Sequence, residues 1–399
     1  MKRISPIVSA ALALLLVLPA AAQAQSNAWE VTPESKAALE RGIEWLARNQ
    51  GAKGNWDNEN LGLVSMGLLA YLSAGHLPGR GKYGHNSQMA MDYILNNAKP
   101  SGLLNIAVRG HDMYNHGLAT FVLGQLYGMT GDKRVGRVLD RALRLIQDSQ
   151  CSDGGWDYVA ISKPEGHDLS LTVMQAKALR SAMDCGFKVD SRSIERALAY
   201  VRRHYVPEGG HRREEPLEQI KRRAGMFTYQ PNGNLARAGI TMTSIGVVCL
   251  QEFGQYDDWR IGTSMQYIRK TVQAGEKVFN DQYRLSKKTR SYAIEPNHVP
   301  FDAYTLYYLS QAIYQRGGDD WKICYTILRN ELVKRQKVEP NNPQQNGAWL
   351  TSLWGMRDKE AQLYGTAIGC FTLAIPNRYL PILQEGRIES LIKPVGEKE

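Results

Sequence analysis

Polar side chains of complementary chemistry recur four residues apart at five places along the chain. The pairs are Asp112 and His116, Asp168 and Thr172, Arg237 and Thr241, His298 and Asp302, and Glu360 and Tyr364. In a helix, residues four apart share a face, so each pair would point the same way once its helix has begun. Imidazole and carboxylate groups that lie together can tune each other for proton transfer. The pattern therefore predicts a site for acid–base chemistry.

The candidate catalytic residues are the carboxylates and the imidazole of these pairs, namely Asp112, His116, Asp168 and Asp302. The candidate ligand contacts are their polar and aromatic neighbours: His111, Tyr114, His167, Arg237, His298, Tyr304, Tyr308, Glu360 and Tyr364. A structural interpretation stays open beside the chemical one. Aspartate at a helix start caps free backbone N–H groups and suits the helix dipole. The tyrosines at helical spacing also suit a core.

A repeated unit organises the segments that must position these residues. Gln50, Gly54 and Trp56 follow a helical segment that contains Arg41, and Gln150, Gly154 and Trp156 follow one that contains Arg141; Gln336, Gly347 and Trp349 repeat the pattern near the end. Weaker copies begin near Ala90, Arg196 and Thr263. The spacing indicates six units, each with one helix before the Gly-aromatic turn and one after it.

The two helices of a unit differ in composition. The first is amphipathic: Val135, Val138, Leu139, Ala142 and Ile146 form a stripe opposite three arginines. The second is small and apolar on nearly every face, in segments 61–72, 114–127, 169–183, 236–253, 301–314 and 361–374. A helix without a charged face is buried on all sides. Six half-exposed and six buried helices predict an all-α (α/α)6 toroid, whose parallel inner helices would gather the polar pairs at one mouth.

The repeats resemble the QW repeats of the squalene-hopene cyclase and protein prenyltransferase superfamily. Stretches 113–120, 301–308 and 379–382 are similar to exported prenyltransferase/squalene-oxidase repeat proteins. The resemblance implies a terpenoid-cyclase toroid and an isoprenoid or other apolar ligand in a central cavity. The D-x-D-D acid motif and a D-D-x-x-D motif are absent, and the cysteines lack the neighbours that a prenyltransferase zinc site needs. We therefore expect no metal and no cofactor.

The amino terminus has the layout of a secretory signal peptide. Lys2 and Arg3 precede an apolar run from Ile7 to Ala22, and a small-x-small pattern ends at Ala24. We expect residues 1–24 to be a signal peptide and 25–399 to be one toroid domain, exported to the periplasm or secreted. A retained anchor is the alternative, and no later segment is apolar enough to span a membrane. The 5 cysteines form no C-x-x-C pair; Cys249 and Cys370 fit small buried positions.

Three inserted loops, near 206–224, 274–296 and 338–346, interrupt the units. The net charge of +10 is compatible with an acidic ligand but does not require one, and no nucleic-acid reader motif is present. Three functions stay open: a terpene cyclase/prenyltransferase-like protein that binds an isoprenoid, a non-catalytic toroid that binds a ligand or a protein, and a polysaccharide lyase or hydrolase that acts on acidic glycans.

Overall fold

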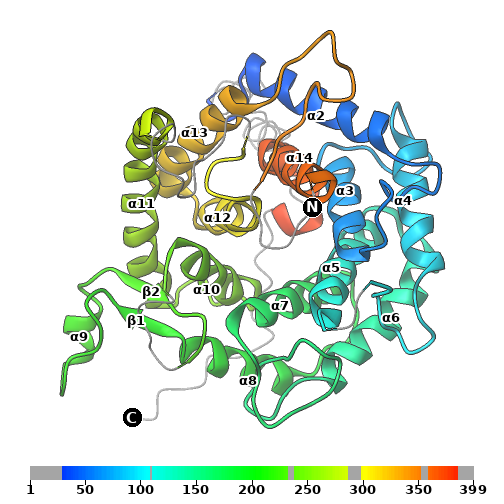
Figure 1. Ribbon diagram of the computed structural model, residues 1–399. Helices are drawn as coiled ribbons and strands as arrows, with labels where there is room; N and C mark the ends of the chain where they lie inside the picture. The colour runs from blue at the N-terminus through cyan, green and yellow to red at the C-terminus, as the bar shows by residue number, and fades with distance from the viewer. Residues whose placement is uncertain (1–28, 108–109, 232–237, 286–297, 352–357, 385–399) are drawn as a thin grey trace, which may run out of the picture.

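Six inner helices form a closed ring in the computed structural model, which describes residues 29–107, 110–231, 238–285, 298–351 and 358–384 (Figure 1). The inner helices are α3 (Leu61–Ser73), α5 (Asp112–Thr130), α7 (Leu169–Asp184), α10 (Ile240–Glu252), α12 (Ala303–Arg316) and α14 (Asp358–Ala374). Each packs against the next in chain order, and α14 packs against α3. The predicted (α/α)6 toroid is confirmed.

The inner helices run parallel. The evidence is that residues later in one helix contact residues later in its neighbour. Gly117 of α5 lies against Met174 of α7, and seven residues later Gly124 lies against Ser181. Between α10 and α12, Thr241 bonds Thr305 near the start of both helices, and Gln251 bonds the carbonyl of Ala312 nearer their ends. All six amino termini therefore face one mouth of the ring, and the carboxyl termini face the other.

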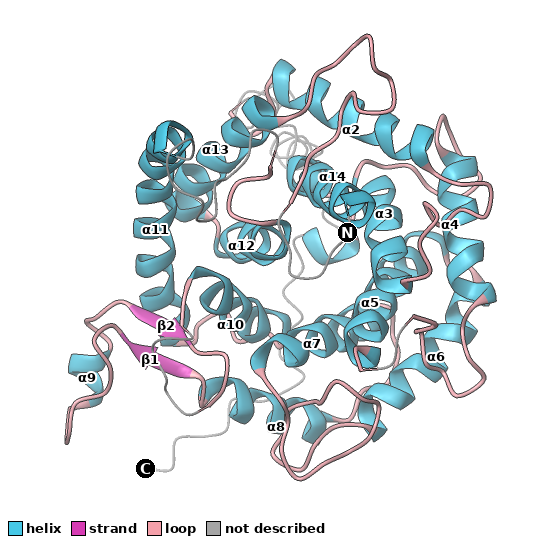
Figure 2. Cartoon of the chain, viewed as in Figure 1, coloured by secondary structure: helices cyan, strands magenta, loops and turns pink. Residues whose placement is uncertain are grey.

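The outer layer surrounds this ring (Figure 2). It consists of α2 (Pro33–Asn49), α4 (Gly84–Asn96), α6 (Lys133–Asp148), α8 (Ser191–Arg202), α11 (Trp259–Leu285) and α13 (Gly318–Arg335). The amphipathic pattern is confirmed in α6, which buries Val135, Leu139 and Ile146 and exposes Arg137 and Arg144. The inner helices have no exposed face of this kind, since α3 is buried at every position.

The glutamine of the repeat joins adjacent units, and we call this contact the glutamine clamp. In Gln150 the side-chain Nε2 donates to the carbonyl of Gly154, 3.0 Å away, and to Ser193 of the next outer helix, 2.9 Å away. Gln50 bonds Gly54 and Asn86 in the same way. Gln336 bonds Gly347 and, at 2.8 Å, the carbonyl of Ala38 in the first unit. The last clamp therefore closes the ring.

The glycine and tryptophan of the repeat have separate structural roles. The indole N–H of Trp156 donates to the carbonyl of Ile146 at 2.8 Å, and Trp56 and Trp349 bond their own outer helices at the same distance. Gly154 has a φ of +98°, and a Cβ there would lie 2.2 Å from the Arg196 carbonyl oxygen. Only glycine suits that turn.

Two short strands, one short α-helix and two 3-10 helices are added to the toroid in the described residues. The insertion near 206–224 includes α9 (Leu217–Ile220) and lies between β1 (Tyr205–Pro207) and β2 (Gly225–Phe227), which pair antiparallel with Tyr205 opposite Phe227. The loop predicted from residue 274 is wrong in its first part, because α11 continues to Leu285: its charged residues are also good helix formers. After α14, η2 (Ile375–Asn377) packs against α14 itself, and η3 (Pro381–Leu383) packs against α5 and α7.

The cysteines and the hydropathy of the helices bear on two expectations. All five cysteines are free, and Cys249 and Cys370 are fully buried, as predicted. Within the described ranges, no helix combines the length and apolarity needed to cross a membrane. The predicted signal peptide, residues 1–24, lies outside the described residues, so its cleavage and the export of the chain stay predictions.

Candidate functional site

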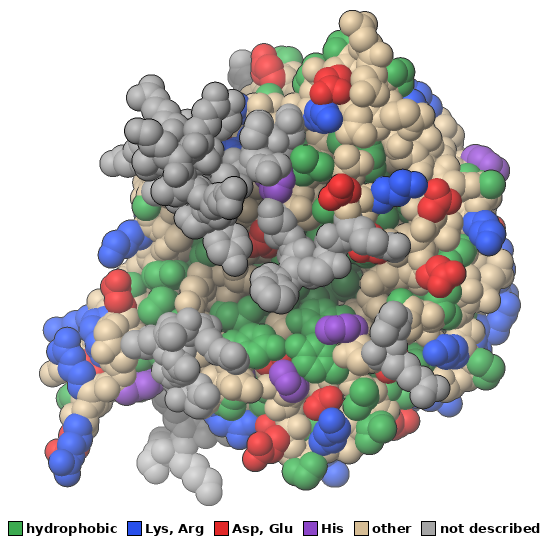
Figure 3. Space-filling model, viewed as in Figure 1, with side chains coloured by type: hydrophobic (Ala, Val, Ile, Leu, Met, Phe, Trp, Pro, Cys, Tyr) green, Lys and Arg blue, Asp and Glu red, His purple; other side chains and the backbone are tan. Residues whose placement is uncertain are grey.

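The amino-terminal mouth of the inner ring carries a group of polar and aromatic side chains joined by hydrogen bonds. Figure 3 shows this face, with hydrophobic side chains in a central hollow and histidines among the residues around it. The group is centred on Asp168, the N-cap of α7, whose side chain is fully buried. It also includes His167, Tyr114, Tyr158 and Tyr229. We call these five residues the α7 mouth cluster.

Asp168 uses both carboxylate oxygens as acceptors. Its Oδ1 accepts from the backbone N–H of Ser170 at 2.8 Å, from Leu171 at 3.1 Å and from the Ser170 hydroxyl. Its Oδ2 accepts from Tyr158 at 3.2 Å and from Nδ1 of His167 at 2.8 Å. Five donors hold the carboxylate in one position, and this leaves it little capacity to contact a substrate. The capping interpretation is therefore correct for Asp168, and the carboxylate also orients His167.

His167 is the exposed member of this pair. Its side chain is 41% exposed, whereas that of Asp168 is 0% exposed. Because the carboxylate can only accept, Nδ1 of the neutral ring carries the hydrogen and Nε2 carries the free lone pair. His167 lines a surface depression of about 580 Å³ together with Tyr229, Gln230 and Met242. A base held by an orienting carboxylate beside an open depression is an arrangement suited to proton abstraction.

The cluster contains three tyrosines, and the rings of Tyr158 and Tyr229 pack against His167. The ring of Tyr158 stands edge-on to His167 with 4.5 Å between centroids, and its hydroxyl lies 3.0 Å from that of Tyr229. Tyr114 packs 5.7 Å from Tyr158 and bonds Ser170. Burial is the largest cause that raises the pKa of Tyr114, Tyr158 and Tyr229 above the ordinary value. These hydroxyls therefore stay protonated at neutral pH and can donate hydrogen bonds.

A second aspartate caps α12, which α10 separates from α7 in the ring. Asp302 accepts from the backbone N–H of Thr305 at 2.8 Å and from its hydroxyl at 2.7 Å, and that hydroxyl lies 2.7 Å from Thr241 of α10. Burial raises the pKa of Asp302. Tyr304 and Tyr308 pack edge-to-face at 5.1 Å behind it. Tyr308 is completely buried and donates to the Met174 sulfur, and Tyr364 is nearly so.

The remaining predicted residues are dispersed. His116 is fully buried: its Nδ1 accepts from Leu104 N at 3.1 Å, and its Nε2 bonds the carbonyl of Ala142 at 3.1 Å. Both ring nitrogens thus serve the packing of α5, and this geometry does not favour the proposed catalytic role. Asp112 bonds Asn105 at 2.6 Å.

The other ligand candidates occupy different parts of the mouth. His111 is exposed and stacks edge-on to Tyr158 at 5.4 Å, beside the cluster. His298 lies in a bridge to Leu350, and Glu360 accepts from Asn58 at 3.4 Å, so neither is placed in the cluster by these contacts. Arg237 lies outside the described residues.

Sequence reasoning missed Tyr158 and Tyr229. Both lie in loops before inner helices, where no helical period marks them. The clue was their position: Tyr158 comes two residues after the repeat tryptophan, and Tyr229 two residues after Phe227, which takes the tryptophan's place.

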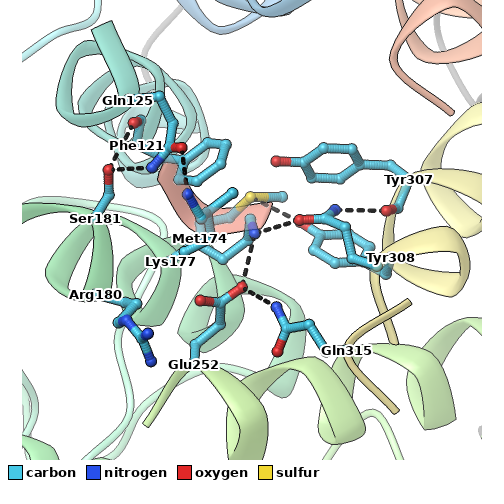
Figure 4. A network of polar contacts seen from close by, with 12 residues as sticks. Phe121, Gln125, Met174, Lys177, Arg180, Ser181, Glu252, Tyr307, Tyr308 and Gln315 are labelled. Atoms are coloured by element: carbon cyan, nitrogen blue, oxygen red, sulfur yellow. Dashed lines mark hydrogen bonds and ion pairs between the residues drawn. The ribbon is translucent and has the colours of Figure 1, made fainter. Parts of the chain in front are cut away.

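Reasoning from the sequence also missed a buried ion pair inside the inner ring (Figure 4). The Lys177 ammonium lies 2.9 Å from Glu252 Oε1 and 2.5 Å from Gln311 Oε1, and both charged side chains are 1% exposed. It also lies 4.3 Å from the ring centre of Phe121. Desolvation lowers the pKa of Lys177. A charged pair, an amide and an aromatic ring therefore pack together inside the ring at this level.

Comparisons with known proteins add overall similarity only. The sequence matches no protein-family model and no curated protein. An inactive variant of an α-1,6-mannanase of Salegentibacter sp. HEL1_6, in complex with α-1,6-mannotetrose, aligns over 86% of this chain and 100% of its own, with 10% identity and a TM-score of 0.48. The type II terpene cyclase MstE from Scytonema aligns over 88% and 100%, with 12% identity and a TM-score of 0.29. The activities in those names belong to those proteins.

Among the described residues, no three His, Cys, Asp or Glu side chains are grouped to hold a metal ion. The α7 mouth cluster offers one imidazole nitrogen and several phenol hydroxyls, a set suited to proton transfer and to hydrogen bonds with hydroxylated ligands.

Proposed function

We propose that this chain is an acid–base enzyme that cleaves an acidic polysaccharide by β-elimination, with the α7 mouth cluster as its active site. One observation carries the proposal: His167 is held by the buried Asp168, is open to a surface depression, and has protonated tyrosines beside it. The chain's net charge of +10 favours attraction of an acidic glycan.

In the proposed reaction, His167 acts as the base and a tyrosine as the acid. Nε2 of His167 removes the proton from the carbon beside the uronate carboxylate. The electron pair of the broken C–H bond then forms a carbon–carbon double bond in the sugar ring. The bond from the ring to the glycosidic oxygen breaks, and Tyr229, which lines the depression, donates its proton to the departing oxygen. Asp168 stabilises the imidazolium that forms and does not touch the substrate.

Hydrolysis fits this geometry less well. A glycosidase of the usual kind needs two carboxyl groups that face the scissile bond. Asp168 has five donors, and Asp302 caps α12 through two bonds to Thr305. Elimination requires only a base and an acid, and the α7 mouth cluster supplies both.

The experiment follows the ultraviolet absorbance of unsaturated uronates when the protein is mixed with polygalacturonate, alginate, hyaluronan or heparin. We expect a rise with at least one polymer, and a loss of about 100-fold or more in His167→Ala, in line with the contribution of a general base. His85→Ala, an exposed histidine on α4, is the matched control. Absence of unsaturated product from every polymer, or full activity in His167→Ala, would refute the proposal.

An apolar ligand of the isoprenoid kind is the second candidate. It is favoured by the aromatic side chains of Tyr304, Tyr308 and Tyr364 near the starts of α12 and α14, and opposed by the packed polar side chains around Lys177. Native mass spectrometry of the purified protein separates the two candidates, because a co-purified isoprenoid would favour this one. A non-catalytic toroid would show neither product nor loss on mutation of His167.

A further inference from the structure

The carboxyl-terminal mouth of the inner ring contains a second pocket, at the end opposite His167. Its volume is about 680 Å³. It is lined by residues from the last turns of α7, α10 and α12 and from the segment that follows α14. A pocket of this size suits a small ligand. None of the residues of the α7 mouth cluster lines it.

Three arginines from three different elements line the pocket, accompanied there by the single acidic residue Asp257. Arg180 already has partners within the protein, since it bonds Asp184 at 2.8 Å and Tyr256 at 3.4 Å. Arg316 lies 3.6 Å from Asp320, its ion-pair partner among the described residues, and its side chain is 45% exposed. Arg378 bonds the Tyr314 hydroxyl at 3.1 Å and lies 3.4 Å from Glu30.

The acidic residues beside Arg316 and Arg378 each have a second, closer hydrogen-bond partner. Asp320 bonds Arg269, with Nε at 2.8 Å, so its contact with Arg316 is secondary. Glu30 accepts from the Trp321 indole at 2.7 Å, which leaves a longer contact to Arg378. Each guanidinium has five N–H donors. Arg316 therefore keeps most of its donors available for an anion. Arg378, which also donates to the carbonyl of Pro376 at 3.4 Å, keeps two.

The amides and the carboxylate behind the arginines lack donors. Gln251 Oε1, Gln315 Oε1 and Glu252 Oε2 are buried with no hydrogen-bond partner among the described residues. The amide nitrogens are already used, by the Ala312 carbonyl and by Glu252 Oε1. Buried acceptors without partners are uncommon and call for water or a ligand that supplies hydrogens.

We infer that this pocket binds a small hydroxylated anion, a sugar acid or a sugar phosphate. Arg316 and Arg378 hold the charged group, and the hydroxyls of the ligand donate toward Gln251 and Gln315, whose side chains line the pocket. The inference goes beyond the proposed β-elimination and does not depend on it, since no residue is shared between the two sites.

Isothermal titration calorimetry of the full chain tests the inference, with glucuronate, glucose 6-phosphate, inorganic phosphate and glucose as probes. We expect glucuronate or glucose 6-phosphate to bind, glucose not to bind, and inorganic phosphate to bind at least tenfold more weakly because it cannot engage the amides. Arg316→Gln, at an exposed side chain, should weaken anion binding about tenfold, the loss of one charge-assisted bond.

Two controls separate this site from the rest of the molecule. Arg144→Gln, on the surface of α6, should leave anion binding unchanged, and His167→Ala should bind glucose 6-phosphate, which is not a uronate, as the wild type does. Circular dichroism establishes that each variant is folded. The inference is overturned if no anion binds, if inorganic phosphate binds as tightly as glucose 6-phosphate, if Arg316→Gln binds like the wild type, or if His167→Ala abolishes binding.

Discussion

The buried histidines should make the protein sensitive to mild acid. The pKa of His116 is lowered to about 4 because burial penalises the charged ring, and burial also lowers the pKa of His204 to about 4. In the unfolded chain, both would titrate near 6.5. As the pH falls between these values, the unfolded state takes up protons that the folded state does not. Stability is therefore complete above about pH 6.5 and is lost toward pH 4.

The size of this loss follows from the two values. One pKa unit corresponds to about 1.4 kcal/mol, so at pH 4.5 each histidine removes roughly 2–3 kcal/mol from the free energy of unfolding. Two of them remove about 5 kcal/mol, which is a large part of the 5–15 kcal/mol typical of a domain. The protonated His116 ring would also lose the bond from Leu104 N.

Urea unfolding at pH 7 and pH 4.5, followed by circular dichroism, measures the effect. Carboxylates also titrate in this range, so the informative quantity is a difference between proteins. His116→Asn should be less stable than the wild type at pH 7 but should lose about 2–3 kcal/mol less on acidification, whereas His85→Asn should lose as much as the wild type. Equal losses in wild type and His116→Asn would refute the argument.

Three further predictions concern the fold. Lys177→Met should lower the free energy of unfolding by about 3–5 kcal/mol, because it leaves Glu252 buried without its cation. Adding Glu252→Gln should restore part of the lost stability. A double variant no more stable than Lys177→Met alone would contradict the pairing. Gly154→Ala should lower the melting temperature by several degrees, because its Cβ would meet the Arg196 carbonyl at 2.2 Å, whereas Gly262→Ala, with nothing within 4 Å, should not. Burial raises the pKa of Tyr304, Tyr307 and Tyr308 well above the ordinary value, so stability should fall as the pH rises above about 10, where only unfolded tyrosines ionise; an unchanged urea midpoint at pH 11 would count against it.

The repeat was predictable from the sequence because its physics is local. Gly154 and Trp156 lie within one turn, and their spacing from Gln150 is set by that turn, so the pattern survives in the linear order. The apolar second helices were predictable for the same reason. Composition along one helix suffices to show that it has no exposed face.

The chemistry was less predictable because it depends on direction and on distant partners. Asp112 and His116 share a spacing with Asp168 and Thr172, but the ring of His116 bonds Ala142 of the outer helix α6. Nothing in the spacing distinguishes these outcomes. The partners Lys177 and Glu252 are 75 residues apart. The available signal was Lys177, which follows eight uncharged residues of α7 in a helix expected to be buried; a buried lysine implies a partner without naming it.

The final glutamine clamp affects how the chain acquires its structure. Gln336 bonds Ala38 across 298 residues, and Trp321 bonds Glu30 across 291. Closing a loop of that length costs about 5 kcal/mol of chain entropy, and the contacts that repay it cannot form until both ends of the ring exist. During synthesis, the units can pair only with the neighbours already made, as an open arc. The apolar flanks of the first and last units stay uncovered in that arc, so a chain shortened after α12 should aggregate rather than form a smaller ring.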